Sequence, residues 1–380
     1  MRGNTNRSTT RRVRAALSTA VAVCAVTAVL PAAASAEPAA ASAEPTAVAG
    51  AAGDGGAGVE RISVAADGTQ AAGASAGASI TSDGRRVIFS SSATNLTADG
   101  TTGGDRVYVR DRRTGQTERL GTLPPLEPPV ISGDGEYAAY SVRWFNDVRI
   151  RLNQVSTVRE ISLNCLAYSC GQPSLSADGR YVAHVISSVR QPSFGQRIEV
   201  RDESAGTQET VAQLGHTQPS RPSISDDGRY VAYQDGQAQD VFVWDRTDGT
   251  ASGPIEGPSE EAALVQLSKD GGKVVYLSGS DTHVHDVSSG AAQLVPDVRG
   301  VAIDPTGRYL LYAPHDADGP SLVLRDLETG TDETVSEQPA SAGTDAVSAG
   351  GRDVVFQSAA DDIVPGDTNG MSDVFVRRSY

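Results

Sequence analysis

Three oxygen-bearing side chains near the C-terminus have the spacing of a cation-binding loop. Asp367, Asn369 and Asp373 lie in the motif Asp-x-Asn-Gly-x-x-Asp, in which Gly370 permits a sharp bend. Carboxylate and amide oxygens that alternate around such a bend are typical calcium ligands. Pro365 stands where a further acidic ligand would help, so a plain turn is the competing interpretation. The prediction is therefore no cofactor, with calcium at these three residues as the alternative.

A second group of residues has the chemistry of a binding surface. Arg143, Trp144 and Phe145 are consecutive. Successive side chains of a strand point to opposite faces, so at least one of the two aromatic rings is expected at the surface. Exposed aromatic rings beside an arginine are typical of the residues that dominate binding to a partner. Burial inside the fold is the competing interpretation, because aromatic side chains are usually buried.

Catalytic signatures are missing. The sequence has no phosphate-binding loop and no His-Glu-x-x-His pair. Acidic side chains are many, but no pattern singles out a general acid and a general base. No catalytic residue is predicted.

The first 58 residues differ in character from the rest of the chain. Residues 1–14 are basic, residues 15–30 form an apolar run, and Ala34-Ser35-Ala36 has the small-x-small form that signal peptidase needs. We therefore interpret residues 1–36 as a signal peptide, with an uncleaved membrane anchor as the alternative. Residues 37–58 are rich in Ala, Gly and Pro and are interpreted as a flexible linker. The predicted location is extracellular or in the cell envelope, with no integral membrane segment after cleavage.

Cysteine use agrees with an exported protein. Cys165 and Cys170 are the two cysteines that remain once residues 1–36 are removed. In an oxidising compartment a close pair indicates a disulfide, although two free thiols or a metal-binding pair are alternatives.

Net charge excludes one class of partner. The chain carries −15, and residues 1–36 hold five Arg and no Asp or Glu, so the mature protein carries −20. Such a charge repels nucleic acid, and no nucleic-acid partner is expected.

The elements that position these residues come from a repeat. A Ser-x-Asp-Gly-Arg marker followed by alternating apolar residues occurs seven times, and the spacing of its glycines averages 44.5 residues. In the first copy Ser82 is taken as the marker serine, without the spacer residue. An Asp-Gly pair between alternating runs predicts a β-hairpin turn, and the period fits the four strands of a propeller blade. The marker glycines are Gly84, Gly135, Gly179, Gly228, Gly271, Gly307 and Gly351.

A second marker follows each first one. It is an alternating strand that ends in Asp before a Gly turn, as in residues 241–249. The chain ends on such a strand, Asp373–Arg378, without the outer strand that should follow. Residues 59–64 have the pattern of that missing outer strand. We therefore predict an all-β, seven-bladed propeller of four-stranded antiparallel blades over residues 59–380, closed by pairing of the N- and C-terminal strands.

The two markers resemble the WD40-like, PD40-type repeats of the TolB-like bacterial β-propellers. Residues 176–183, Ser-Ala-Asp-Gly-Arg-Tyr-Val-Ala, and residues 367–377 are similar to these repeats in particular. The resemblance covers nearly all of residues 59–380. It implies the propeller fold, and it does not specify a function.

Function is expected on the irregular connections of the blades, because variable loops on a rigid scaffold usually carry binding sites. The main hypothesis is a secreted, non-catalytic, monomeric scaffold that recognises a protein or peptide at the loop face and the channel mouth. The alternative is a carbohydrate-active lyase or hydrolase on the same propeller. Oligogalacturonate lyases, which resemble this fold family, hold a metal with histidines. In this sequence His283, His285 and His315 have no supporting pattern.

Overall fold

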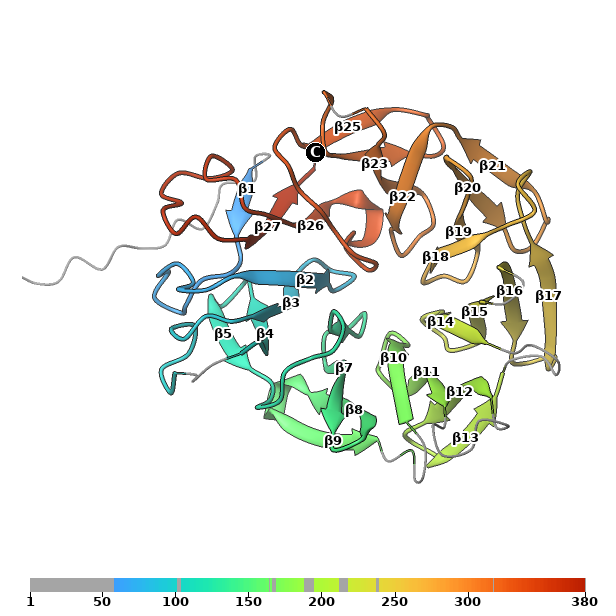
Figure 1. Ribbon diagram of the computed structural model, residues 1–380, viewed down its shortest axis with the longest axis horizontal. Helices are drawn as coiled ribbons and strands as arrows, with labels where there is room; N and C mark the ends of the chain where they lie inside the picture. Colours follow the sequence, from blue (N-terminus) through green and yellow to red (C-terminus); the bar gives the residue numbers. More distant parts are fainter. Residues whose placement is uncertain are drawn as a thin grey trace, which may run out of the picture. The chain divides into compact units, whose positions relative to one another are not determined.

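The computed structural model describes residues 58–100, 104–163, 165, 169–187, 195–211, 218–236, 239–316 and 318–379. The predicted signal peptide, residues 1–36, and almost all of the predicted linker lie outside the described residues. In the compact unit of residues 50–380, short antiparallel sheets stand around a central axis as seven blades (Figure 1). The predicted all-β propeller is confirmed. Within the described part of the chain, no helix is both long and apolar enough to cross a membrane.

Each blade is one sheet, and we call its strands a to d from the axis outward. Blade 1 has β2 (Ser75–Ile80), β3 (Arg86–Ser91), β4 (Arg106–Asp111) and β5 (Gln116–Arg119). Blade 2 has β6 (Val130–Ile131), β7 (Tyr137–Trp144), β8 (Asp147–Gln154), a 3-10 turn at Val155–Thr157, and β9 (Arg159–Leu163). Blade 3 has β10 (Ser169–Leu175), β11 (Tyr181–Ser187), β12 (Gln196–Asp202) and β13 (Thr207–Thr210).

The remaining blades follow the same order. Blade 4 has β14 (Pro219–Ile224), β15 (Tyr230–Asp235), β16 (Asp240–Asp245) and β17 (Thr250–Ile255). Blade 5 has β18 (Ala263–Leu267), β19 (Lys273–Ser278), β20 (Asp281–Asp286) and β21 (Ala292–Val295). Blade 6 has β22 (Val298–Ile303), β23 (Tyr309–Pro314), β24 (Leu322–Asp326) and β25 (Asp332–Ser336). Blade 7 has a 3-10 turn at Ala349–Gly351, β26 (Asp353–Ser358), β27 (Asp373–Arg378) and β1 (Val59–Arg61).

Blade 7 closes the ring from both ends of the chain. Strand β1 pairs antiparallel with β27, and the two lie side by side in Figure 1. The paired strand is shorter than residues 59–64, but the Ile62 amide still donates to the Val374 carbonyl at 2.8 Å. The inner strand of this blade is reduced to two isolated bridges, Ser341 with Gln357 and Val347 with Val354. The predicted closure is confirmed.

The Asp-Gly marker makes its own turn through local hydrogen bonds. In blade 3 the Ser176 hydroxyl donates to the Asp178 carboxylate, and the same hydroxyl oxygen accepts the Tyr181 amide. In the first copy Thr81 takes this place, because its hydroxyl donates to Asp83 and accepts the Arg86 amide. The choice of Ser82 as the marker serine was therefore wrong, since Thr makes the same bonds and preserves the spacing.

The marker glycines also join neighbouring blades. All seven have φ between 66° and 77°. A Cβ on any of them would come closer than 3.0 Å to a side chain of the preceding blade, such as Tyr181 for Gly228 and Tyr230 for Gly271. Gly84 lies against Asp353 of blade 7, so the series runs around the whole ring. Glycine is therefore required by both the backbone conformation and the packing.

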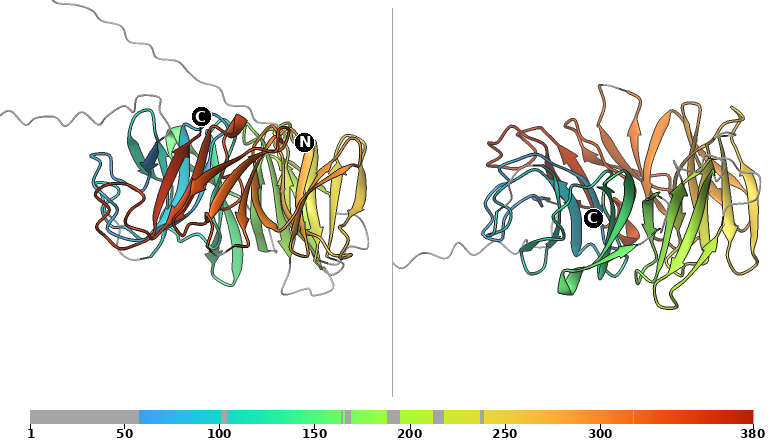
Figure 2. Two further views of the ribbon diagram at one scale, coloured as in Figure 1. Left: turned by 90° about the horizontal axis from the view of Figure 1, so that it is seen from above. Right: turned by 60° about the horizontal axis from the view of Figure 1, so that its bottom comes forward.

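The second marker is tied to the first within each blade. Asp245 at the end of strand c binds the Arg229 guanidinium at 2.7 Å and accepts the Thr247 amide of the Gly turn. The corresponding pairs are Arg85–Asp111, Arg180–Asp202, Lys273–Asp286 and Arg308–Asp326. These pairs place the Asp-Gly turns and the Gly turns on one side of the disc, which we call the turn face. The opposite side, reached by the b–c and d–a connections, is the loop face (Figure 2).

Candidate functional site

The b–c hairpin of blade 2 carries the aromatic residues singled out from the sequence. Its strands β7 and β8 have eight residues each and are the longest that the structure describes. Trp144 pairs with Asp147, so Phe145 and Asn146 alone form the tip. The tip lies on the loop face, at the opposite end of strand b from the Asp-Gly turn. The predicted exposure is present, since Trp144 is 45% and Phe145 84% exposed.

Phe145 has a backbone conformation that its side chain disfavours. Its φ is 54°, in the left-handed region. A two-residue hairpin turn of this hand is best made by Gly or Asn, because a Cβ is crowded there. A bulky residue in this region is uncommon and is maintained only when its surroundings or its use require it.

The hairpin holds its tryptophan with a cation. The Arg151 guanidinium lies 5.2 Å from the centre of the Trp144 ring and is bound to Glu160 at 2.8 Å. Phe145 meets Trp144 edge to face, with ring centres 5.4 Å apart. Residues 143–151 carry three Arg and one Asp, a charge of +2 in a chain that is strongly acidic. The tip is thus a preformed aromatic surface bordered by guanidinium groups.

A proline-rich segment beside this hairpin was not identified from the sequence. Pro125 forms a bridge with Val142, and the Leu126 amide donates to the Ser141 carbonyl at 2.8 Å. Leu126 is 47% exposed. The run of four prolines in residues 124–129 is a signal for extended surface chain, which is how it could have been found. It adds an apolar side chain to the blade 2 surface.

The candidate calcium residues are brought together, but their oxygens have partners. Asp373 accepts hydrogen bonds from the Ser63 hydroxyl at 2.5 Å and the Asn369 amide at 3.1 Å. Arg61 lies 3.2 Å from Asp367 and 3.9 Å from Asp373. Asn369 therefore presents a donor to Asp373 where a calcium ligand would present an oxygen, and Arg61 supplies the positive charge. This network joins the N- and C-terminal strands, and calcium at these residues stays the untested alternative to the prediction of no cofactor.

The histidines of blades 5 and 6 are spread over separate environments. His283 stacks on Tyr276 with ring centres 5.0 Å apart, and burial lowers its pKa. Burial also lowers the pKa of His285, while the His315 ring contacts the Ser280 carbonyl at 3.0 Å. Among the described residues, no three His, Cys, Asp or Glu side chains are grouped closely enough to hold a metal ion.

Cys165 and Cys170 are bonded to each other, with their Cα atoms 6.0 Å apart. Both sulfur atoms belong to the apolar core between blades 2 and 3. The bond therefore attaches the chain entering blade 3 to that core.

The sequence does contain one pentapeptide with the spacing of a serine nucleophile, Gly-x-Ser-x-Gly at residues 73–77. Its Ser75 begins β2, the a strand of blade 1, and is 1% exposed. The Ser75 hydroxyl donates to the Ser91 hydroxyl at 2.8 Å. A nucleophile elbow needs an exposed serine at a strand-to-helix turn, so this serine is structural.

Beside the innermost strand of blade 5 lies an ion pair that the sequence did not indicate. Lys269 lies 3.3 Å from Asp345, and Gln266 donates to the same carboxylate at 2.8 Å. Asp226 lies nearby, where burial raises the pKa of its carboxyl. Lys269 and Asp226 occupy the spacer position of their markers, which is Ala or Gly in three other blades. That contrast is the signal that could have identified this position.

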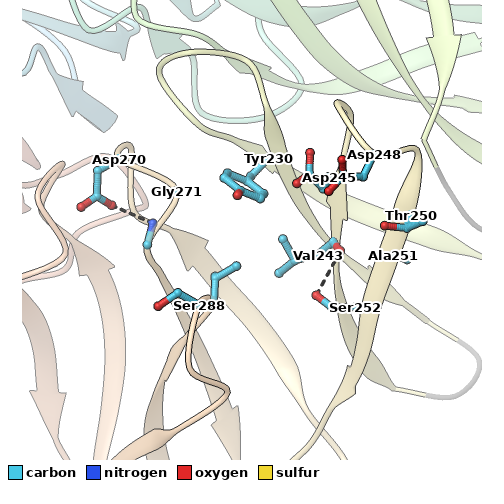
Figure 3. Close-up of a pocket in the computed structure, with 12 residues that line it drawn as sticks. Tyr230, Val243, Asp245, Asp248, Thr250, Ala251, Ser252, Asp270, Gly271 and Ser288 are labelled. Atoms are coloured by element: carbon cyan, nitrogen blue, oxygen red, sulfur yellow. Dashed lines mark hydrogen bonds between the residues drawn. The ribbon is translucent and has the colours of Figure 1, made fainter.

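A cavity of about 380 Å³ lies between blades 4 and 5 on the turn face. Figure 3 shows Tyr230 and Val243 between Asp270 on one side and Asp245 and Asp248 on the other. The sequence pattern indicated binding on the loop face, so this cavity was not predicted. The cavity is lined by residues of two different blades, which no local pattern in the sequence connects.

Comparison with known proteins identifies the fold. No family model and no curated protein sequence matches the chain. An oligogalacturonate lyase in complex with manganese has a TM-score of 0.61 at 14% identity, over 85% of this chain and 93% of that one. The oligogalacturonate lyase of Vibrio parahaemolyticus has a TM-score of 0.59 at 13% identity, over 85% and 90%. TolB from Acinetobacter baumannii has a TM-score of 0.45 at 17% identity, over 68% and 62%. At these identities the likeness concerns the fold alone, and the chain is a seven-bladed β-propeller similar in fold to the two lyases.

Proposed function

We propose that the protein is a secreted, non-catalytic scaffold that recognises a protein or peptide at the loop face and channel mouth of the propeller. Arg143, Trp144 and Phe145 are the proposed contact residues. The observation that carries the proposal is Phe145 itself, a large apolar side chain that is 84% exposed and has a φ of 54°.

Folding alone does not account for this residue. A non-glycine residue in the left-handed region costs about 1 kcal/mol relative to glycine, and an exposed ring recovers little by burial. A partner that covers both rings recovers more, because buried aromatic side chains at the centre of an interface contribute about 2 kcal/mol or more each. The cation–π contact of Arg151 fixes the Trp144 ring in advance, which lowers the entropy lost on binding.

A site-specific photo-crosslinker at position 145 tests the proposal in the producing cells and their medium. The matched control carries the crosslinker at Leu294 on β21, which is 52% exposed and lies in blade 5. We expect a protein adduct specific to position 145, and at least a tenfold loss of affinity for that partner in the Trp144→Ala/Phe145→Ala variant. The same adducts at both positions would refute the proposal.

The alternative, a carbohydrate-active lyase or hydrolase, is tested with the same purified protein. The mature chain is incubated with acidic and neutral polysaccharides, and released oligosaccharides are measured. Cleavage that exceeds a heat-inactivated control would replace the scaffold proposal with the enzymatic one.

Export is part of the proposal. N-terminal sequencing of the protein from the culture medium or cell envelope is expected to begin at Glu37. Recovery of the full-length chain from the cytosol alone would contradict it.

A further inference from the structure

We propose that the cavity between blades 4 and 5 binds the guanidinium group of an arginine side chain from a partner polypeptide. The cavity lies on the turn face of blades 4 and 5, whereas the aromatic tip lies on the loop face of blade 2. The two sites are therefore independent. At two other blade boundaries an arginine of the protein itself occupies the equivalent position.

At the boundary of blades 3 and 4 an arginine of the protein fills this position. Arg246 directly follows β16 and donates to the Gly228 carbonyl at 2.5 Å. Its guanidinium lies 4.5 Å from the centre of the Tyr181 ring and 3.1 Å from Glu209 on the outer strand of blade 3. The tyrosine, the marker glycine and the outer strand thus form three walls around a guanidinium.

The boundary of blades 7 and 1 repeats the arrangement. Arg112 directly follows β4 and donates to the Gly84 carbonyl at 2.6 Å. It also binds Glu60 on the outer strand of blade 7 at 2.9 Å and Asp353 at 3.0 Å. Two boundaries of the ring therefore place an arginine of one blade against a glutamate of the preceding outer strand.

At the boundary of blades 4 and 5, shorter side chains take the places of this arginine and this glutamate. By strand register, Val287 corresponds to Arg246, and Ser252 corresponds to Glu209. Tyr230 and Gly271 keep the places of Tyr181 and Gly228. Among the described residues, no side chain donates to the Gly271 carbonyl. The tyrosine and the glycine are thus retained while shorter side chains stand between them, and the cavity lies at this position.

The charges around the cavity favour a cation. Its lining includes Asp245, Asp248 and Asp270, and it includes no Lys or Arg. Arg229 neutralises Asp245 at 2.7 Å and lies over one face of the Tyr230 ring, 4.7 Å from its centre, as Arg180 does at Tyr181. Asp248 and Asp270 leave a net negative charge next to the Tyr230 ring, and a planar guanidinium can satisfy a carboxylate, a carbonyl and an aromatic face together.

Nuclear magnetic resonance of the isotopically labelled mature protein tests the ligand class. The probes are N-acetyl-arginine methylamide and its citrulline counterpart, which has nearly the same shape without the charge. We expect saturable shifts of Gly271, Ser252 and Ser288 with the arginine compound, at a dissociation constant in the millimolar range. Equal shifts with the citrulline compound would overturn the proposal.

Two variants test the position. Val287→Arg/Ser252→Glu installs the pair found at the filled boundaries and is expected to abolish the shifts while the melting temperature stays the same or rises. Asp248→Asn is expected to weaken binding roughly fivefold, and the matched charge control Asp361→Asn in the exposed b–c loop of blade 7 is expected to leave binding unchanged. Retained binding in a folded double variant would refute the site.

A peptide library with a central arginine distinguishes a polypeptide from a free small cation. Peptides that bind at least tenfold more tightly than the capped arginine, and that lose binding in the double variant, support the polypeptide ligand. If every peptide binds no better than the capped arginine, the polypeptide source is wrong.

Discussion

The boundary of blades 3 and 4 and the boundary of blades 4 and 5 have the same walls and different contents. Each has a marker glycine with a φ of 72° or 77° against a tyrosine of the preceding blade. In the first, Arg246 and Glu209 fill the space between the walls. In the second, Val287 and Ser252 leave a cavity.

This difference separates the residues that build the ring from the residues that decide what it contacts. The marker residues recur because every turn and every blade contact needs them. The residue after strand c and the facing residue of the outer strand vary, because the ring is stable with either content. The following predictions test this separation, from the largest effect to the smallest.

The largest effect is expected at the boundary of blades 7 and 1, where the N- and C-terminal strands pair. Deleting residues 37–58 from the mature protein should leave the melting temperature nearly unchanged. Deleting residues 37–64 removes Ile62, which is fully buried, together with the Ser63–Asp373 hydrogen bond and Arg61. This second deletion should cost about 5 kcal/mol, since it creates a cavity and unpaired buried polar groups. Thermal unfolding of both variants measures it, and equal melting temperatures would disprove closure.

The next effect concerns a wall that both boundaries share. Gly228→Ala should cost about 3 kcal/mol, because it adds a Cβ against the Tyr181 ring to the strain of a left-handed φ. Gly206→Ala is the matched control, with a φ of 67° and nothing within 4 Å of the added Cβ. It should cost about 1 kcal/mol. Urea unfolding compares the two, and equal losses would show that packing between blades contributes nothing.

A third boundary, between blades 2 and 3, should respond to acid. His184 is 3% exposed, and burial lowers its pKa to about 4. The unfolded chain binds the proton below its ordinary pKa of about 6.5, so stability should fall as the pH drops from 6.5 to 4 and stay flat above 6.5. The loss is about 3 kcal/mol at most. Urea unfolding at several pH values should show a steeper slope in the parent than in His184→Gln, because His283 and His285 contribute equally in both proteins. Equal slopes would refute it.

The side chains at this position of the two boundaries should contribute differently to the free energy of unfolding. Arg246→Ala removes a hydrogen bond to Gly228 and a cation–π contact with Tyr181, and it should cost about 2 kcal/mol. Val287 already borders a cavity, so Val287→Ala should cost less than about 1 kcal/mol. The free energies of unfolding of the two variants provide the measurement. A larger loss for Val287→Ala would reverse the comparison.

The smallest effect is expected at the loop-face tip. Trp144→Ala/Phe145→Ala should change the free energy of unfolding by about 0.5 kcal/mol or less, because both rings are exposed. Circular dichroism and thermal unfolding check this alongside the crosslinking experiment. A large loss of stability would assign the rings to the scaffold and not to a partner.

Much of the fold could be read from residues close together in the chain. The turn at residues 176–181 depends on a serine, an aspartate and a glycine within six residues, so the marker predicts it wherever it occurs. Even the substitution of Thr81 for serine follows the same local chemistry. The exposed tip could be predicted in part, since two adjacent aromatic rings cannot share one face of a strand.

From the sequence, the strand period, the number of blades and the closure at the termini could be predicted, together with exposure of at least one of the rings of Trp144 and Phe145. Each depends on alternation, on turn chemistry or on counting, which act within a few residues. Tertiary structure alone decided that Asp367 and Asp373 meet Arg61, that Lys269 meets Asp345, and that a cavity replaces the arginine between blades 4 and 5. These contacts join residues that lie far apart in the chain, so they depend on which side chains the closed ring places together.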